Sequence, residues 1–481
     1  MHPNPYRNYY YYYYNNGNRY QPPTNNHGYN GYYINKQNNN GPIKVQPNIS
    51  PNIQKINNKN QQNNLVNSKL KPAYEEKKTK NRGVSQIVQQ TTNKLVSINT
   101  SNINPKSRSF SNGTIALLNI GNTCFFNAAL QNLKNTFILT KNLLVDCLKI
   151  NFPEFTNEFR HLLANLINQD LPQQYFSPNK FYSQLVSMTT LFNYGQQNDS
   201  NICIIYILNM LEREIKSFKP FIKIDYSPIY LISKLNDDVN KMEKFKVFFK
   251  KYCDKRRCPI IDNFYGFQLD IYKCENKGCN YVNYTIQIIS VLNLPIVDRD
   301  NKRISKLEKA IKYYQEKFIH IKEKDFICKQ CDKSNISTQS ILISLPKILI
   351  INLKRIGEQN FYSHNLDIPL NLYSKDFSMN SNGNNYEYEL TGFIKHYGGG
   401  NSGHNIAICK NFFDSIWYEY NDSRVKAITN SNNYNKNNKE NIDLSNGFLF
   451  FYAMKEKTPL DNNKNILLDI AAKAKELRNK I

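Results

Sequence analysis

Residues 113–133 read GTIALLNIGNTCFFNAALQNL, and the interpretation of the whole chain starts from this stretch. A short apolar run leads into a polar turn around Gly121, after which apolar residues recur at helical spacing. Glycine permits the backbone of a tight turn, and Asn122 and Thr123 are residue types that favour helix starts. The pattern places Cys124 in a first helical turn, where unpaired N–H groups and the helix dipole favour a thiolate. Cys124 is therefore a candidate nucleophile, although a buried structural cysteine would show the same pattern.

The composition limits the classes of protein to which the chain can belong. Of its 481 residues 40% are hydrophobic, enough for the core of one large domain or two ordinary ones. The sequence has no run of 18 apolar residues, and its opening MHPNPYRNYY lacks the apolar segment of a secretory signal. We therefore expect no membrane association, no secretion, and a cytoplasmic or nuclear location. Ten cysteines in such a compartment indicate thiols, metal ligands or a nucleophile rather than disulfides.

Residues 1–110 differ from the rest of the chain in composition. They are rich in Asn, Gln and Tyr, with a tyrosine run at 9–14 and little apolar periodicity. Such a segment cannot bury enough apolar surface to offset chain entropy, so we expect a disordered tail. The chain carries a net charge of +25, and a basic, tyrosine-rich tail is compatible with an RNA or other anionic partner. A passive tail with solvated lysines is an equally consistent interpretation.

The rest of the chain changes from helical to strand-like periodicity. Residues 137–215 are expected to be mainly helical, with an apolar stripe at 155–166 and a helix from Ile202 to Leu211 that Asp199 caps. Strands are predicted at 264–294, 340–356, 386–410, 417–425 and 446–454, and further helices at 303–320 and 465–479. The stretch 340–356 is interpreted as one buried strand, and 386–410 as two strands joined by a Gly-rich loop. Helices followed by strands indicate an α+β domain.

A nucleophilic cysteine needs a base within hydrogen-bond reach and a partner that orients this base. Among seven histidines, His404 follows a Gly-rich loop and begins an apolar alternation, which predicts a loop-to-strand junction. His396, at the end of the preceding strand, is the rival candidate. Asn421 and Asp422 follow His404 by 17 and 18 positions, a spacing suited to the next antiparallel strand. Either side chain could accept the imidazole N–H and fix the tautomer.

An acyl-transfer site also needs donors for the oxyanion that forms in the reaction. Asn119 lies five residues before Cys124, across the turn. Its side-chain amide and the Cys124 backbone N–H could therefore converge on one point. The alternative is that Asn119 serves only to shape the turn.

Two cysteine pairs predict a metal site between strand-like segments. They are Cys274 with Cys279 and Cys328 with Cys331. Four thiolates match a closed tetrahedral zinc site, and the second pair has a common zinc-knuckle spacing. Cys253 and Cys258 form a competing pair near a basic cluster. Three cysteines in apolar surroundings are expected to be core thiols: Cys147, Cys203 and Cys409.

Together these segments resemble the ubiquitin-specific protease family. The stretch at 113–133 is similar to its Cys box, and HYGGGNSGHNIAICK with the following WYEYNDSRV and FLFFYAM is similar to its His box. FYGFQ, the two cysteine pairs, LNLPI and LPKILIINLKRI match the intervening landmarks in order. The resemblance covers 113–454. It implies a papain-like catalytic domain at 111–456 with a helical thumb, zinc-bearing β fingers and a β palm, followed by a helical extension at 457–481.

The resemblance also assigns roles to single residues. Cys124 would be the nucleophile, His404 the general base and Asn421 the third catalytic residue. Asp422 would be an auxiliary acid and Asn119 the oxyanion donor. The four cysteines of the two pairs would hold a structural zinc ion in the fingers.

The family's substrate is the C-terminal Gly-Gly of ubiquitin in an isopeptide bond. Gln197 and Asp199 fall where the family contacts the ubiquitin tail, and an acid there could pair with the tail's arginines. The chain departs from the family at Ile202, where Glu is usual, at Asn405, where an aromatic residue is usual, and in the longer spacer of the first cysteine pair. These departures concern ubiquitin affinity and tail alignment more than the reacting groups.

The sequence therefore predicts a cysteine-dependent isopeptidase that removes ubiquitin from proteins by covalent acyl transfer. Two other functions are compatible with it. The chain could be a ubiquitin-binding scaffold whose activity is lost through Ile202 and Asn405. It could also be an RNA-associated scaffold that acts through residues 1–110.

Overall fold

Three sheets and a group of helices make up the part of the chain that the computed structural model describes. This part comprises residues 112–167, 173–216, 247, 258–298, 300–316, 319–321, 327–355, 362–378, 385–399, 402–428, 442–455 and 463–479, all in one unit of the chain. The tail predicted over 1–110 lies outside these residues. Among the described helices, none has the length and apolar character that a membrane span requires.

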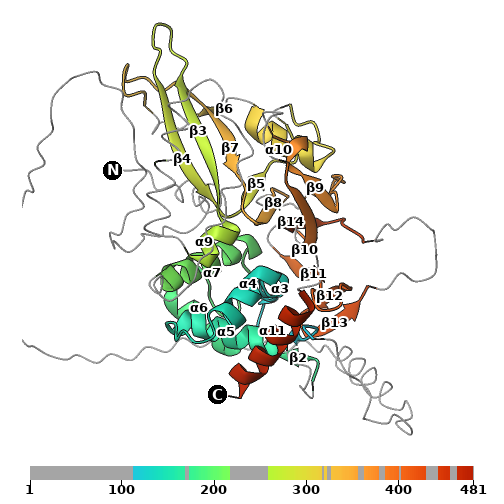
Figure 1. Ribbon diagram of the computed structural model, residues 1–481. Coiled ribbons are helices and arrows are strands. Elements are labelled where there is room, and N and C mark those ends of the chain that lie inside the picture. The colour runs from blue at the N-terminus through green and yellow to red at the C-terminus, as the bar shows by residue number, and fades with distance from the viewer. Residues whose placement is uncertain are drawn as a thin grey trace, which may run out of the picture. The chain divides into compact units, whose positions relative to one another are not determined.

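Helices dominate the first half of the described chain, as the sequence predicts. They are α3 (Cys124–Asn135), α4 (Phe137–Lys141), the π-helix η1 (Asn142–Asp146), α5 (Glu154–Leu166), α6 (Asn179–Met188), α7 (Ser200–Ile215) and α9 (Pro259–Phe264). Every residue of α3 is buried, because this helix packs against both α7 and the large sheet. The short parallel strands β1 (Ala116–Leu117) and β2 (Tyr175–Phe176) precede α3 and α6. These helices form the expected thumb (Figure 1).

An eight-stranded sheet forms the expected palm. Its order is β13-β12-β11-β10-β14-β8-β5, and β9 also pairs with β10. The strands are β5 (Leu292–Leu294), β8 (Ile348–Leu353), β9 (Asn371–Tyr373), β10 (Glu387–Gly398), β11 (Gly403–Lys410), β12 (Trp417–Asn421), β13 (Arg424–Ala427) and β14 (Gly447–Met454). A 3₁₀ turn, η3 (Ser374–Asp376), follows β9. The antiparallel hairpin β10–β11 confirms the two strands predicted around the Gly-rich loop, and its register pairs Tyr397 with His404.

A separate four-stranded sheet forms the expected fingers. Its order is β4-β3-β7-β6, all antiparallel. The strands are β3 (Gly266–Cys274), β4 (Val282–Ile289), β6 (Ile319–Ile321) and β7 (Ile336–Ser344), with the helix α10 (Leu307–Glu316) packed on β7 (Figure 1). The α+β fold with thumb, palm and fingers is thereby confirmed.

Two sequence expectations about element boundaries were wrong. The stretch 340–356 is not one strand, because β7 ends at Ser344 and β8 begins at Ile348 in a different sheet. Pro346 lies between them, and proline cannot donate a ladder hydrogen bond, so the chain changes sheet there. The helix expected over 303–320 ends at Glu316, and 319–321 pairs with β7 instead.

The last helix, α11 (Asn463–Arg478), agrees with the helix predicted at 465–479. It packs against α5, and its buried Ile470 and Ala474 belong to the same apolar core as the thumb helices (Figure 1). Arg478 donates a hydrogen bond from Nη1 to the Ala164 carbonyl at 2.8 Å. The boundary between a catalytic domain at 111–456 and an extension at 457–481 stays a prediction of the sequence.

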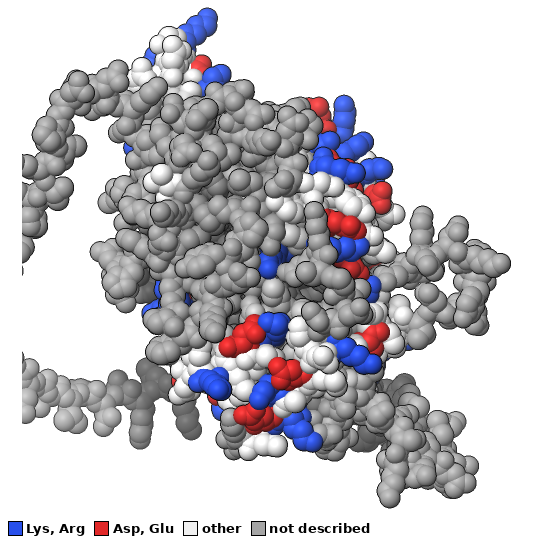
Figure 2. Space-filling view, in the orientation of Figure 1, with Lys and Arg blue, Asp and Glu red and all other residues white. Residues whose placement is uncertain are grey.

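The described charges on one face of the molecule are mixed in sign. On the face in Figure 2, the described Lys and Arg side chains lie among Asp and Glu side chains instead of forming one basic patch. On this face the net charge of +25 is therefore not gathered into an anion-binding surface among the described residues.

Candidate active site

The turn before α3 brings Cys124 to the first position of the helix, as predicted. Gly121 has φ +113° and Asn122 has φ +55°, two successive residues in the left-handed region, which glycine and asparagine tolerate best. Asn119 Oδ1 accepts hydrogen bonds from the N–H groups of Gly121 at 3.0 Å and Thr123 at 3.1 Å. One side-chain oxygen therefore satisfies two backbone donors of the turn. The Thr123 side chain, expected to cap the helix, makes no capping bond.

The nucleophile candidate and the base candidate meet in the structure. Cys124 is 3% exposed at the start of α3, and His404 lies at the start of β11. A hydrogen bond with Cys124 raises the pKa of His404 to about 9, although burial of the ring acts in the opposite direction. The Nε2 atom of His404 lies 2.7 Å from Asn421 Oδ1, so Nδ1 is the ring nitrogen that remains available to the sulfur. This cysteine–histidine–asparagine arrangement can perform nucleophilic catalysis.

Asp422 connects the turn before Cys124 to the strand that carries Asn421. It has φ +48° and lies between β12 and β13. Its Oδ2 accepts from Asn119 Nδ2 at 2.9 Å and lies 4.0 Å from His404 Nε2. Its charge adds to the rise in the pKa of His404. An amide nitrogen carries two hydrogens, so Asn119 retains one for a further acceptor after bonding Asp422.

Asn127 is a site residue that the sequence reasoning missed. It is buried on α3 and donates from Nδ2 to Asp422 Oδ1 at 2.8 Å. Both oxygens of the Asp422 carboxylate thus accept bonds from the Cys124 segment. The sequence does contain a signal for this residue: it is a polar side chain three positions after Cys124, in an otherwise apolar part of the helix.

The rival histidine is engaged elsewhere. His396 is 7% exposed, and its Nδ1 and Nε2 lie 3.0 Å from Asn405 Oδ1 and 2.9 Å from the Gly399 carbonyl. A ring with both nitrogens occupied cannot also serve as the base for Cys124. The unusual Asn405 is thus the hydrogen-bond partner of a buried histidine on the neighbouring strand.

Gln197 and Asp199 lie in the segment that precedes α7. Gln197 is exposed, donates from Nε2 to the Gly403 carbonyl at 2.9 Å, and accepts from the Gly403 N–H at 3.3 Å. Asp199 is the N-cap of α7, as the sequence predicts, and accepts from the Asn201 N–H at 2.7 Å. Burial raises the pKa of the Asp199 carboxyl, and the bond from Asn201 opposes this rise. Ile202 packs against the apolar core.

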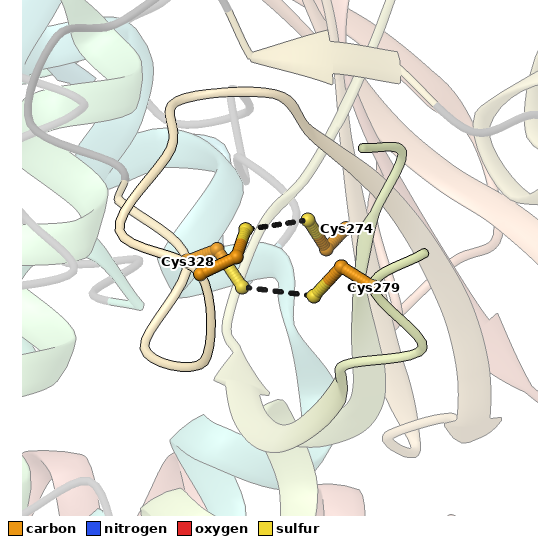
Figure 3. A group of neighbouring side chains, drawn as sticks. Cys274, Cys279 and Cys328 are labelled. Carbon is orange, nitrogen blue, oxygen red and sulfur yellow. Dashed lines mark hydrogen bonds between the residues drawn. The ribbon is translucent and has the colours of Figure 1, made fainter. Parts of the chain in front are cut away.

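The two predicted cysteine pairs come together between the ends of the finger strands. Figure 3 shows Cys274, Cys279 and Cys328 with their sulfur atoms directed toward one another. The four sulfurs, including that of Cys331, all lie within 4.8 Å of one another. The Cys274–Cys331 and Cys279–Cys328 sulfur distances are 3.7 and 3.6 Å. Sulfurs bound to one zinc ion at about 2.3 Å lie about 3.8 Å apart at the corners of a tetrahedron, so this group could hold such an ion.

Hydrogen bonds from outside the cluster reach two of its sulfur atoms. Asn276 Nδ2 donates to Cys274 Sγ at 3.2 Å, and the Gln330 N–H donates to Cys328 Sγ at 3.4 Å. Burial would raise the pKa of Cys274, but the bonds from Asn276 and from the other thiols lower it to about 7. Partners that orient ligands in this way are typical of metal sites.

The remaining described cysteines lie away from both sites. Cys258 belongs to the apolar core, where burial raises its pKa to about 12, and Cys253 lies outside the described residues. Cys147, Cys203 and Cys409 are buried, and burial raises the pKa of each, which confirms them as core thiols.

A second missed residue is Lys134, near the end of α3. It is fully buried, and its Nζ donates to the Gly113 carbonyl and to Tyr420 Oη at 3.2 Å. Tyr420 itself donates to the Gly113 carbonyl at 2.9 Å. Burial lowers the pKa of Lys134 to about 7. The lysine thus connects the end of the Cys124 helix to the strand that carries Asn421.

Comparisons with known proteins agree with this geometry. The sequence profile of the family described as "Ubiquitin carboxyl-terminal hydrolase" matches residues 115–452. "Ubiquitin carboxyl-terminal hydrolase 21" of Rattus norvegicus is 24% identical over 377 residues, covering 72% of this chain and 62% of that protein. "Ubiquitin carboxyl-terminal hydrolase 2" of Bos taurus is 25% identical over 353 residues, covering 71% of this chain and 55% of that protein. The chain thus spans less than two thirds of the length of these relatives.

Solved structures share the fold. The SAGA DUB module of Ubp8, Sgf11, Sus1 and Sgf73 bound to monoubiquitin contains a chain that matches with a TM-score of 0.51 and 18% identity, covering 77% of this chain and 74% of that one. A chain of a yeast SAGA DUB module matches with a TM-score of 0.52 and 20% identity, covering 78% and 76%. The family profile covers more than half of the present chain, and the cysteine and histidine of the site lie inside the matched range. The protein therefore belongs to the ubiquitin carboxyl-terminal hydrolase family, as a member of the ubiquitin-specific protease type.

Proposed function

We propose that the protein is a cysteine-dependent isopeptidase that hydrolyses the bond after the C-terminal glycine of ubiquitin in ubiquitin–protein conjugates. The observation that carries this proposal is the hydrogen-bonded series Cys124–His404–Asn421, assembled from α3, β11 and β12. The family membership supports the same chemistry.

In this mechanism His404 Nδ1 takes the proton from Cys124 Sγ, and the thiolate attacks the carbonyl carbon of the terminal glycine. Asn421 accepts the Nε2–H and holds the ring in the orientation that faces the sulfur. The imidazolium then gives its proton to the departing lysine amine, and a thioester forms on Cys124. A water molecule, deprotonated by His404, hydrolyses this thioester and releases ubiquitin.

Asn119 is proposed as the donor that stabilises the oxyanion of each tetrahedral intermediate, together with the Cys124 backbone N–H. Its Oδ1 accepts two bonds from the turn and its Nδ2 bonds Asp422, so the amide is held in a fixed orientation. A donor fixed before the reaction costs little reorganisation when the charge develops. Asp422 acts as an auxiliary acid by orienting Asn119 and by favouring the imidazolium form of His404.

The cysteine cluster of the fingers is proposed to hold a structural zinc ion. The ligands would be the four cysteines of the cluster, Cys274, Cys279, Cys328 and Cys331. With four protein ligands, a zinc ion leaves no open position for a substrate, and it would link β3 to the segment before β7. The proposed partner is ubiquitin, with Gln197 and Asp199 near the path of its tail.

The decisive experiment is covalent labelling with ubiquitin that carries a C-terminal electrophile. The full chain should gain one ubiquitin on Cys124, and Cys124→Ala should gain none. Cys147→Ala, which removes a buried thiol elsewhere in the thumb, is the matched control and should label like the wild type. Binding of ubiquitin without any adduct would instead support the inactive scaffold. The same electrophile on other ubiquitin-like proteins tests whether the enzyme acts on ubiquitin or on one of these other modifiers.

The RNA-associated scaffold concerns residues 1–110, outside the described part of the chain. Deleting these residues and measuring RNA binding against salt concentration tests it, because binding through phosphate contacts weakens steeply with salt.

A further inference from the structure

The segment 193–198, which we call the bridging turn, contacts the two parts of the chain that carry the reacting groups. The thumb holds this turn firmly. Tyr182 Oη donates to the Asn193 carbonyl at 3.1 Å, and Asn198 Nδ2 donates to the Leu191 carbonyl at 2.7 Å. Directly after it, Asp199 caps α7. The turn is therefore a fixed support rather than a loosely attached loop.

On one side the bridging turn contacts the segment before Cys124. Asn122 Nδ2 donates to the Gly195 carbonyl at 2.7 Å. A Cβ atom added to Gly121 would lie 3.9 Å from the Gly195 Cα, so the two backbones pass close to each other. The nucleophile comes two residues after Asn122.

On the other side the bridging turn contacts the residue before His404. Gln197 both donates to and accepts from the main chain of Gly403, 206 positions away in sequence. The side-chain amide of Gln197 makes both bonds at once, whereas the ionised carboxylate of a glutamate would have no donor for the Gly403 carbonyl. Gly403 itself cannot carry a side chain without displacement, because a Cβ there would lie 2.4 Å from His396 Nε2.

We propose that Gln197 is a positioning residue, and that through it the bridging turn sets the separation of Cys124 and His404. This inference rests on the proposed function, because it concerns the same two reacting groups. One rigid turn fixes the approach of the nucleophile through Asn122 and that of the base through Gly403. Misplacement of reacting groups by a fraction of an ångström lowers rates markedly, so the loss of one of these contacts should slow the reaction. This role is different from the ubiquitin-tail contact that the family resemblance implies for Gln197.

The test compares Gln197→Ala and Gln197→Glu with Gln196→Ala. Gln196 is the exposed neighbour in the same turn, and its Oε1 accepts only from Asn193 within the turn, at 3.2 Å, in the contacts described. The first measurement is the rate of alkylation of Cys124 by iodoacetamide across pH, followed on the Cys124 peptide by mass spectrometry. It needs no ubiquitin, so it reports on the Cys124–His404 pair even if the proposed function fails.

The alkylation rate near neutral pH should fall about tenfold in Gln197→Ala, the scale expected for the loss of one or two neutral hydrogen bonds. Cys124 in Gln197→Glu should be alkylated no faster than in Gln197→Ala, because the carboxylate cannot donate to the Gly403 carbonyl. Gln196→Ala should match the wild type. With a fluorogenic ubiquitin substrate, kcat should fall by a similar factor while KM changes less than about twofold.

A rise in KM with unchanged kcat and unchanged alkylation would overturn the proposal and assign Gln197 to substrate binding alone. Equal losses in Gln196→Ala would overturn it as well, because the effect would then belong to the turn as a whole. Thermal melting of each variant shows that any loss of alkylation occurs in a folded protein.

Discussion

The catalytic centre and the cysteine cluster are assembled in different ways. The cluster draws on two short segments, each of which supplies two sulfurs within a few residues of each other. The catalytic centre draws on segments that are far apart, so that Asn119 and Asp422, which share a hydrogen bond, are separated by 303 positions. The cluster therefore needs only the finger strands to form, whereas the catalytic centre needs the thumb and the palm packed together.

The two sites also differ in what holds them. Side-chain amides and one carboxylate align the reacting groups, and each of these hydrogen bonds contributes only about 1–3 kcal/mol to stability. A zinc ion in the cluster would instead contribute directly to the folding free energy of the fingers. A mutation can therefore remove activity at the first site without unfolding, whereas at the second it should remove stability.

The largest effect is expected from Cys124→Ala. Because no other group replaces the nucleophile, ubiquitin hydrolysis should fall by at least about 10⁴-fold, while the melting temperature stays close to that of the wild type. Hydrolysis of a fluorogenic ubiquitin substrate and thermal melting measure the two quantities. Activity retained in this variant would end the assignment of the nucleophile.

Cys328→Ser should show the opposite pattern. If the cluster holds zinc, this change should lower the free energy of unfolding by more than about 3 kcal/mol, and a strong chelator should act similarly on the wild type. Mass spectrometry of the intact protein measures the bound metal, and unfolding in denaturant measures the change in the free energy of unfolding. Cys409→Ser is the matched control, since this buried thiol lies outside the cluster and its change should leave metal content unaltered. Unchanged stability with no bound metal would remove the structural zinc from the proposal.

Asn119→Ala should have an intermediate effect on the catalytic centre. The loss of an oxyanion donor typically lowers kcat by about 10²–10³-fold. Asn127→Ala is the comparison, because it removes the other hydrogen bond to Asp422 and leaves Asn119 in place. Equal losses of kcat in the two variants would indicate that Asn119 acts through Asp422 and not on the oxyanion.

The smallest effect is expected in the titration of His404. The pKa of His404 is raised to about 9, with the Cys124 hydrogen bond as the largest cause. In Cys124→Ala an NMR titration should therefore find a lower pKa of His404 than in the wild type, because burial then acts without that bond while Asn421 and Asp422 still raise the pKa. Because folded His404 binds its proton more tightly than the unfolded chain does, its protonation stabilises the fold. This contribution is complete below about pH 6.5 and is lost as the pH rises through about 9. An unchanged pKa of His404 in the variant would contradict the contact between the two groups.

The sequence predicted most of the fold and pointed to the candidate reacting groups because their signals are local. Cys124 follows a turn that glycine marks, and His404 follows a Gly-rich loop and starts a strand. Residues that act through distant partners gave no such signal. Asn127 and Lys134 were missed because burial turns an ordinary polar residue into an essential hydrogen-bond donor, and burial cannot be inferred from position on one helix.

The error at 340–356 has a similar physical origin. The apolar run there is continuous, and a continuous apolar run predicts a buried strand without saying in which sheet. Pro346 interrupts this run, and it lies between the last strand of the fingers and the first long strand of the palm. The interaction of Gln197 with Gly403 gave no sequence signal either, because it joins a turn of the thumb to the first residue of β11 in the palm.

The buried amino group of Lys134 limits how far the catalytic region can be shortened at its N-terminal end. Its acceptors are the Gly113 carbonyl and the Tyr420 hydroxyl, and Gly113 lies just ahead of the first strand. A shortened chain that begins after Gly113 would leave this buried amino group with one acceptor fewer, and an unpaired buried polar group lowers the stability of the fold. Recombinant versions that keep Gly113 and the residue before it should therefore express well, whereas those that start at β1 should aggregate.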